Sequence, residues 1–185
     1  TLGAVMLQTP SSVFSKTVKI SHWVFFPPYH DIDAAIEQVK RWSQKARQEG
    51  YLSLEDESLA HHDPYAAKGL SMLVDGAGET KLRDTLEIDL MLERERLMEV
   101  SRVYEAMGGY SPTIGILGAV LGLIQAMQFI TDPEKLGAGV ATAFIATIYG
   151  VGLANLLFLP MANKLKQQIE QKMLYHELLA EGIIA

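Results

Sequence analysis

Two long stretches without a charged residue constrain this chain more than any other feature of its sequence. They run from residue 106 to 131 and from 136 to 163, separated only by the polar segment from Asp132 to Lys135. About 20 mainly apolar helical residues cross the roughly 30 Å hydrocarbon core of a bilayer, so each stretch is long enough. We therefore predict a transmembrane hairpin over residues 106–163. A single buried core hairpin is the alternative, but the rest of the chain has too little apolar mass to surround it.

Charge is concentrated ahead of this hairpin. The 185-residue chain has 16 lysines and arginines, 22 aspartates and glutamates and a net charge of −6, and most of these residues lie from Asp31 to Glu105. This uneven distribution argues against a simple water-soluble domain. The acidic balance argues against a nucleic-acid-binding protein with a basic surface. The absence of cysteine excludes disulfides, thiolate metal sites and cysteine nucleophiles.

Lysine and arginine near the membrane ends predict the orientation. Three arginines precede the hairpin and three lysines follow it, whereas the turn has Lys135 alone. The flanking residues are Arg94, Arg96, Arg102, Lys164, Lys166 and Lys172. Because cytoplasmic segments are enriched in lysine and arginine, both flanks are predicted to be cytoplasmic and the turn to face the other side.

The cytoplasmic segment is predicted to be helical. From Asp31 to Arg47 a helix is predicted that ends before Gly50, because apolar residues recur on one face, at Ile32, Ala35, Ile36, Val39, Trp42 and Ala46. Asp63-Pro64 is typical of a helix start, with the helix closing at Asp75-Gly76. A long charged helix is predicted from Thr80 to Met107, with Gly108-Gly109 breaking it before the membrane. We find no alternating pattern that indicates a sheet.

These elements predict an all-α, polytopic membrane protein with a helical cytoplasmic domain. The predicted layout is the end of a membrane helix at 1–10, a cytoplasmic domain at 11–105, the hairpin at 106–163 and a cytoplasmic C-terminal helix at 164–185. Thr1 is not an initiator residue, and the apolar run that it opens stops at Thr9-Pro10. We therefore expect the chain to be a fragment.

Small residues recur four apart in both spans. Gly118 and Gly122 form such a pair in the first span, and the second span has two rows. Those rows are Gly139 and Ala143, and then Ala146, Gly150 and Ala154. Such rows let membrane helices approach closely. Packing within the hairpin is one interpretation, but two separate rows favour additional helices, from this chain or from other copies.

The spans contain no Asp, Glu, His or Lys, the residues that mark ion paths and proton relays in membranes. The chain can therefore line a pathway, but a partner with a membrane carboxylate is the simplest source of an ion carrier. Pro112 is predicted to enter the first span at a helix start, where a proline is ordinary. Pro160 lies inside the second span and predicts a kink, for which functional and structural roles both stay open.

The sequence offers no enzyme site, because it has no Gly-rich phosphate loop, nucleophile elbow or HExxH motif. The adjacent His61 and His62 are interpreted as a solvated pair in an exposed loop rather than a metal site. His30 and His176 lie in polar contexts, and His22 follows the first apolar run. We expect no catalytic residue, no metal and no cofactor.

Four segments together resemble a known family. They are Gly50-Tyr-Leu-Ser-Leu-Glu55, Leu73-Val-Asp-Gly76, Tyr110-Ser-Pro-Thr-Ile-Gly-Ile-Leu-Gly118, and Ala146-Thr-Ile-Tyr-Gly150 continuing through Asn155-Leu-Leu-Phe-Leu-Pro160. In this order, over nearly the whole chain, they are similar to the MotA/PomA flagellar stator subunits. Those subunits belong to the wider MotA/TolQ/ExbB proton-channel family.

The resemblance implies a channel-wall subunit that converts proton flow across the bacterial inner membrane into torque on the flagellar rotor. It implies four membrane helices, with the first and most of the second missing here. It also implies a ring of five copies in membrane lipid around a MotB-like, single-span, peptidoglycan-anchored partner that carries the membrane aspartate. A second partner would be the torque-ring protein of the rotor switch.

The resemblance also implies site residues. Pro112 and Pro160 match two prolines thought to couple proton binding to conformational change, and Thr147 matches a threonine lining the path. Ala119 lies where sodium-driven relatives carry threonine, so protons are favoured over sodium, since a methyl group offers a dehydrated cation no oxygen ligand.

Two charged residues of the cytoplasmic domain, Arg47 and Glu55, match charges that face the rotor. Solvated surface residues are the alternative interpretation of both. Gln48 departs from relatives with a second basic residue there, so charge complementarity with the rotor can differ in detail.

Two other functions stay open from the sequence. One is a TolQ/ExbB-like energiser of outer-membrane processes, for which the Gly50-to-Glu55 segment is unexpected. The other is a passive membrane scaffold, in which substitutions at Thr147 and Pro160 would affect only stability.

Overall fold

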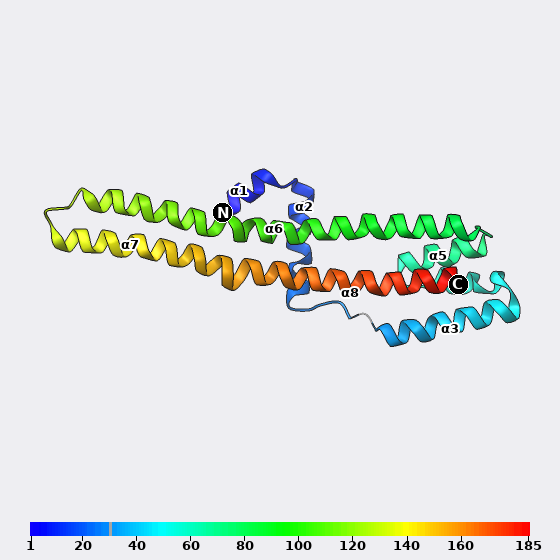
Figure 1. Cartoon of the computed structure of the whole chain (residues 1–185). Coiled ribbons are helices and arrows are strands. Elements are labelled where there is room, and N and C mark those ends of the chain that lie inside the picture. The colour runs from blue at the N-terminus through cyan, green and yellow to red at the C-terminus, as the bar shows by residue number, and fades with distance from the viewer. Residues whose placement is uncertain (30) are drawn as a thin grey trace. The chain divides into compact units, whose positions relative to one another are not determined.

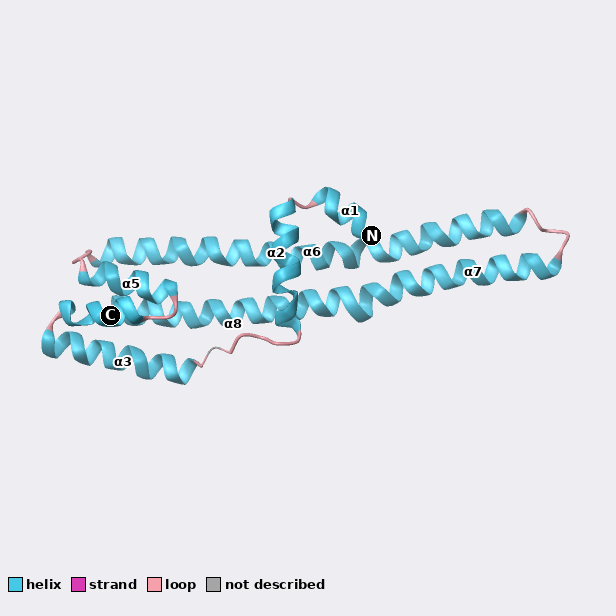
Figure 2. Ribbon diagram, turned by 180° about the vertical axis from the view of Figure 1, so that it is seen from behind, coloured by secondary structure: helices cyan, strands magenta, loops and turns pink. Residues whose placement is uncertain are grey.

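The computed structural model describes residues 1–29 and 31–185, and this part of the chain is helical without a β-strand (Figures 1 and 2). The predicted all-α class is confirmed. His30, one of the histidines considered above, lies outside the described residues. The elements are α1 (Leu2–Gln8), α2 (Ser11–Ile20), η1 (Ser21–Val24), α3 (Ile32–Glu49), η2 (Tyr51–Leu54), α4 (Glu55–Ala60), α5 (Pro64–Val74), α6 (Glu79–Met127), α7 (Pro133–Gly152), η3 (Leu153–Phe158) and α8 (Leu159–Ile184).

The chain forms two compact units. The first, the hairpin unit, contains Thr1–Phe26 and Met98–Lys166, and the second, the cytoplasmic unit, contains Pro27–Leu97 and Gln167–Ala185. Helices α6 and α8 each contribute to both units. The predicted boundaries at residues 105 and 163 refer to the membrane and stay predictions.

Helix α6 corrects one sequence prediction. It runs unbroken from Glu79 to Met127, so Gly108-Gly109 does not end it and Pro112 lies in its interior rather than at a helix start. The positive φ values that would mark a helix-ending glycine occur elsewhere among the described residues, at Gly50 and Gly76. Gly108 has a packing reason instead, because a Cβ there would lie 2.6 Å from Cδ2 of Leu159.

Among the residues that the structure describes, two helices contain segments long and apolar enough to cross a membrane, Glu79–Met127 and Pro133–Ile184. The second includes α7, η3 and α8, so the predicted C-terminal helix continues directly from the second span. The turn between the spans also differs slightly from the prediction. Asp132 caps α7, accepting a hydrogen bond from the Lys135 amide at 3.3 Å, and Glu134 and Lys135 lie within the helix.

The small residues of the two spans face one another. A Cβ on Gly115 would lie 2.9 Å from Cα of Gly150, and a Cβ on Gly139 would lie 2.5 Å from Cβ of Ala126. Between these contacts, Gly118 meets Ala146 and Gly122 meets Ala143. Gly139, Ala143, Ala146 and Gly150 of the two predicted rows therefore pack within the hairpin against the first span.

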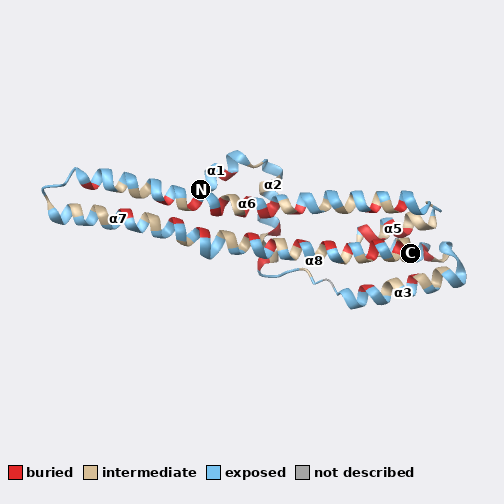
Figure 3. Ribbon diagram, viewed as in Figure 1, coloured by how far each residue is buried: buried red, intermediate tan, exposed pale blue. Residues whose placement is uncertain are grey.

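Large apolar side chains form the core of the cytoplasmic unit. Helices α3, α5, α6 and α8 all contribute, as does Leu54 of η2. Its buried members include Ala35, Trp42, Leu54, Leu70, Leu82, Leu86, Leu179 and Ile183. Figure 3 shows this burial on α5 and the C-terminal part of α8. Of the face predicted for α3, Ala35 and Trp42 are buried, whereas Ile32 and Ile36 are each 37% exposed.

Candidate functional sites

The two prolines lie near one packing contact of the hairpin unit. Pro112 has no amide hydrogen, so the carbonyl of Gly108, four residues earlier, has no helical donor from this position. Gly108 is also the glycine against which Leu159 packs, and Leu159 precedes Pro160. Both helices therefore lack a backbone donor close to this contact and are locally weakened there.

The helix ahead of Pro160 departs from α-helical geometry, whereas the kink predicted at Pro160 itself stays a prediction. Residues Leu153–Phe158 form a π-helical turn between α7 and α8. Single π turns inside α-helices widen the hydrogen-bond ladder and are frequent at functional sites. The Asn155 side chain donates a hydrogen bond to the Val151 carbonyl at 3.0 Å within this distorted stretch.

The two residues implied to line the ion pathway are both partly accessible. Ala119 and Thr147 lie one position after Gly118 and Ala146, which pack against each other, so both are beside the helix contact rather than within it. The Thr147 hydroxyl donates to the Ala143 carbonyl at 3.5 Å, which is at the outer limit of a hydrogen bond. The hydroxyl can therefore turn its hydrogen to another acceptor with little loss.

The two residues implied to face the rotor, Arg47 and Glu55, are exposed in the cytoplasmic unit. Arg47 lies in the last turn of α3, and Glu55 opens α4. The short helix η2 joins them after Gly50, whose φ of 83° favours glycine. Within the described chain, neither side chain forms an ion pair, so both charges are available to a partner.

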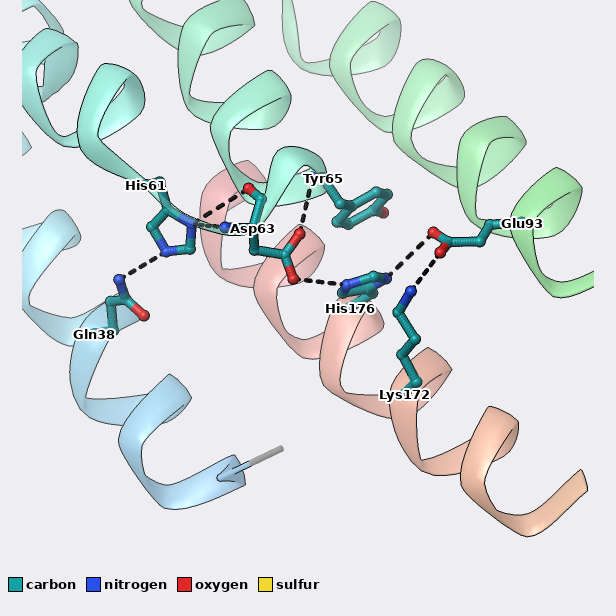
Figure 4. Close-up of polar contacts among 7 residues, drawn as sticks. All are labelled: Gln38, His61, Asp63, Tyr65, Glu93, Lys172 and His176. Carbon is teal, nitrogen blue, oxygen red and sulfur yellow. Dashed lines mark hydrogen bonds and ion pairs between the residues drawn. The ribbon is translucent and has the colours of Figure 1, made fainter. Parts of the chain in front are cut away.

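A polar cluster in the cytoplasmic unit was missed by the sequence prediction. It consists of Asp63, Tyr65, Glu93, Lys172 and His176 (Figure 4). The His176 side chain is only 2% exposed, and its Nε2 donates to Oδ2 of Asp63 at 2.9 Å. Its Nδ1 lies 3.7 Å from Oε2 of Glu93, too far for a hydrogen bond, and Glu93 pairs with Lys172 at 2.5 Å. The cluster links α8 to α6 and to the start of α5.

The surroundings of Asp63 hold its carboxyl in the charged form. Burial alone would raise the pKa of the Asp63 carboxyl, but the hydrogen bond and charge of His176 and the amides of Tyr65 and Ala66 lower it to about 2. Burial raises the pKa of the Tyr65 phenol well above its ordinary value, and nearby carboxylates add to this shift. The Tyr65 ring stacks on His176 with 4.7 Å between centroids, and its hydroxyl donates to the Leu86 carbonyl at 3.1 Å.

A periodic signal could have found part of this cluster. Buried residues of α8 recur at Leu165, Ile169, Met173 and Ala180, and His176 lies on the same stripe. A polar residue in an apolar stripe needs a buried partner. Asp63 could not be identified as that partner from the sequence, because 113 residues separate it from His176.

His61 also differs from its prediction. It is half-buried rather than fully solvated, shares a 2.8 Å hydrogen bond with Gln38 and packs against Trp42 with 5.5 Å between ring centroids. His62 is exposed, as predicted. Across residues 1–29 and 31–185, no three His, Cys, Asp or Glu side chains are grouped as metal ligands.

These features define a class of protein: a polytopic, all-helical membrane protein whose two predicted spans pack closely and contain no Asp, Glu, His, Lys or Arg. Most of the charged residues lie in the cytoplasmic unit.

Comparison with known proteins identifies the family. Residues 57–177 match the MotA/TolQ/ExbB proton channel family. The chain is 32% identical to Motility protein A of Bacillus subtilis (strain 168) over 186 residues, covering 100% of this chain and 69% of the relative. A structure of C. jejuni MotAB matches with a TM-score of 0.93 at 28% identity, over 97% of this chain and 71% of that one. The flagellar MotAB stator complex from Bacillus subtilis matches with a TM-score of 0.91 at 32% identity, over 99% and 72%. The chain belongs to the MotA/TolQ/ExbB proton channel family.

Proposed function

We propose that this chain is the ion-channel wall subunit of a flagellar stator, which converts proton flow across the bacterial inner membrane into torque on the rotor. The observation that carries the proposal is the likeness to two MotAB structures over at least 97% of this chain. This likeness includes both the charge-free hairpin and the cytoplasmic unit. It favours a stator over the TolQ/ExbB-like alternative.

The chemistry of the hairpin supports a channel partner. Its spans have no carboxylate, so a proton crossing the membrane needs a carrier from another chain. We propose that a MotB-like, single-span, peptidoglycan-anchored subunit supplies an aspartate, and that five copies of this chain surround it. The proposed role of this chain is to provide the wall and the moving contact, without catalytic activity.

Protons are the proposed coupling ion. Ala119 offers only a methyl group, whereas a sodium ion stripped of water needs several oxygen ligands. Protonation would neutralise the partner aspartate and change its preferred position against the wall, because burying the charged form costs several kcal/mol more than burying the neutral form. The weakened helix region near Pro112 and Pro160 is the element proposed to respond.

The proposed rotor contacts are Arg47 and Glu55. Exposed ion pairs contribute about 0–1 kcal/mol each and are screened by salt. Such weak contacts suit a surface that must bind and release the rotor's torque-ring protein repeatedly.

The first test is motility in a strain that lacks the full-length gene and any paralogous stator. Intact filaments that do not rotate, with rotation restored by a plasmid-borne copy, would establish the stator function. Normal swimming combined with sensitivity to detergents would instead establish the outer-membrane alternative.

A second test addresses the rotor contacts. Arg47→Glu should reduce torque severalfold while leaving assembly with the partner intact, as measured by bead rotation and by co-purification. Arg41→Glu provides a matched control, because Arg41 is also exposed and lies on the same helix α3. Equal torque in the two variants would contradict the assignment of Arg47.

A further inference from the structure

The segment formed by α2, η1 and the two residues after them has an unusual charge pattern. We call residues 11–26 the crossing segment. From residue 1 to residue 30 the only charged side chains are Lys16 and Lys19, and both are cationic. The cytoplasmic unit that follows contains both basic and acidic side chains, with more acidic than basic ones. The crossing segment is therefore locally basic within an acidic chain.

The crossing segment has buried side chains that pack against the hairpin unit and, on its exposed surface, further apolar side chains. Thr17, Ile20 and Val24 are at most 9% exposed and anchor it within the hairpin unit. Three of its other large side chains are exposed, Val18 at 63%, Phe25 at 72% and Phe26 at 77%. Two adjacent, largely exposed phenylalanines are unusual for a surface that faces water alone.

Two hydrogen bonds attach the crossing segment and the residues just before it to a short stretch of helix α6. The hydroxyl of Tyr104 bonds the Ser21 hydroxyl, and the hydroxyl of Tyr110 donates to Oε1 of Gln8 at 2.8 Å. These two tyrosines flank Glu105, the last charged residue before the uncharged span. Helix α2 runs across α6 rather than along it (Figures 1 and 2). A helix that crosses a membrane-spanning helix at the end of its span lies along the membrane surface.

We propose that the crossing segment binds anionic phospholipid at the cytoplasmic surface of the membrane. Phe25 and Phe26 insert among the lipid chains near the headgroups, where amphipathic segments bury their apolar side chains. Lys16 and Lys19 extend their ammonium groups to the lipid phosphates. The proposal depends on membrane insertion of the hairpin but not on torque generation.

Charge complementarity favours lipid over a second copy of this chain. The segment has two cations and no anion, and anionic lipids attract basic residues near the membrane surface. A second copy presenting the same segment would place like charges together. A neighbouring copy presenting a different surface is tested directly by the experiment below.

The experiment uses the full-length chain with its single-span partner, reconstituted in nanodiscs. The discs contain phosphatidylcholine alone or phosphatidylcholine mixed with phosphatidylglycerol. A photoreactive benzophenone amino acid at position 25 reports what contacts this site, and mass spectrometry identifies the adduct. In the unlabelled complex, competition between the two lipids measures the preference for the anionic one.

We expect adducts with lipid and a preference for phosphatidylglycerol that falls about tenfold in the Lys16→Gln/Lys19→Gln variant. The matched control is Lys40→Gln/Arg41→Gln, which removes two exposed cations from α3 and should leave the preference unchanged. Adducts mainly with a second copy of the chain, or equal preference in all variants, would overturn the proposal.

A third variant keeps the proposal testable if the glutamine variant does not fold. Lys16→Arg/Lys19→Arg keeps both charges and should keep the preference, while raised salt should weaken it in the unmodified protein by screening. A preference insensitive to salt would also overturn the proposal. Lipid competition is measured without a motor, so failure of the torque proposal would leave this result standing.

Discussion

The two units of this protein are stabilised by opposite means. In the hairpin unit, glycine and alanine let two helix backbones come into contact, with a Cβ on Gly150 only 2.8 Å from Cα of Gly115. In the cytoplasmic unit, large side chains fill a core, and the polar cluster around His176 joins its helices. Lipid offers apolar surface as readily as a protein does, so membrane helices gain by close fit rather than by hiding apolar area. Outside the membrane, burial of apolar area is itself the driving force.

This difference predicts which kinds of substitution each unit tolerates. The hairpin unit should be sensitive to added volume at its glycines, whereas the cytoplasmic unit should be sensitive to lost volume and lost polar partners. The following predictions test that contrast, from the largest expected effect to the smallest.

His176→Ala should have the largest effect, lowering the free energy of unfolding by about 3 kcal/mol. The substitution leaves a cavity beside the Tyr65 ring and removes the partner of Asp63. Chemical denaturation of the purified complex, followed by fluorescence, measures the change. His62→Ala is the matched control, because His62 is exposed, and it should change stability by less than about 0.5 kcal/mol. Similar effects of both substitutions would show that the cluster does not stabilise the unit.

Gly115→Ala should destabilise the hairpin unit by about 1–3 kcal/mol, because the added methyl group meets the backbone of Gly150 and forces the helices apart. Gly137→Ala is the control, since a Cβ there has no neighbour within 4 Å. It should leave stability unchanged or raise it slightly, as alanine favours helix. Thermal unfolding of the complex in detergent measures both. A neutral Gly115→Ala would contradict the close-approach account of the hairpin.

Acid should weaken the cytoplasmic unit through Asp63. Its folded pKa of about 2 is below the ordinary value of 3.8, so the unfolded state binds more protons. The carboxylate therefore stabilises the fold above about pH 4, by about 2 kcal/mol, and loses this contribution as pH falls towards 2. Asp63→Asn keeps a helix-capping side chain but should flatten this part of the stability profile.

Asp84→Asn is the control for that measurement, because Asp84 is exposed on α6. It should keep the acid dependence of the unmodified protein in denaturation experiments between pH 5 and pH 2. Equal slopes for the two asparagine variants would exclude Asp63 as the source.

Arg94→Gln should have the smallest effect, about 0.5 kcal/mol, and salt should abolish it. Arg94 pairs with Glu170 at 2.7 Å, but both side chains are nearly half exposed. Lys172→Gln should cost more, because the side chains of Lys172 and Glu93 are only 20% and 33% exposed. Denaturation at low and high salt compares the two variants, and a larger loss for Arg94→Gln would contradict the importance given to burial.

Local patterns allowed much of the fold to be predicted. The start of α5 at Asp63-Pro64 and the end of α3 at Gly50 lie where capping residues indicated them. The continuity of α6 through Gly108, Gly109 and Pro112 could not be predicted in this way. Glycine and proline are poor helix residues by local propensity, and only the contact with Leu159 explains a glycine at 108.

The candidate site residues also divide into those that could be named from the sequence and those that only the structure revealed. Pro112, Ala119, Thr147, Pro160, Arg47 and Glu55 could be named from the sequence through a resemblance, and their roles stay predictions. The cluster around His176 could not be named, since its members come from three separate helices.

The sequence by itself determined the helical class and the two spans without charged residues. These properties follow from composition and periodicity, which act locally along the chain. Only the tertiary structure decided which small residues contact one another, that α6 continues through Pro112, and which carboxylate pairs with His176. Those outcomes depend on contacts between distant residues, whose free energy exists only once the helices have packed.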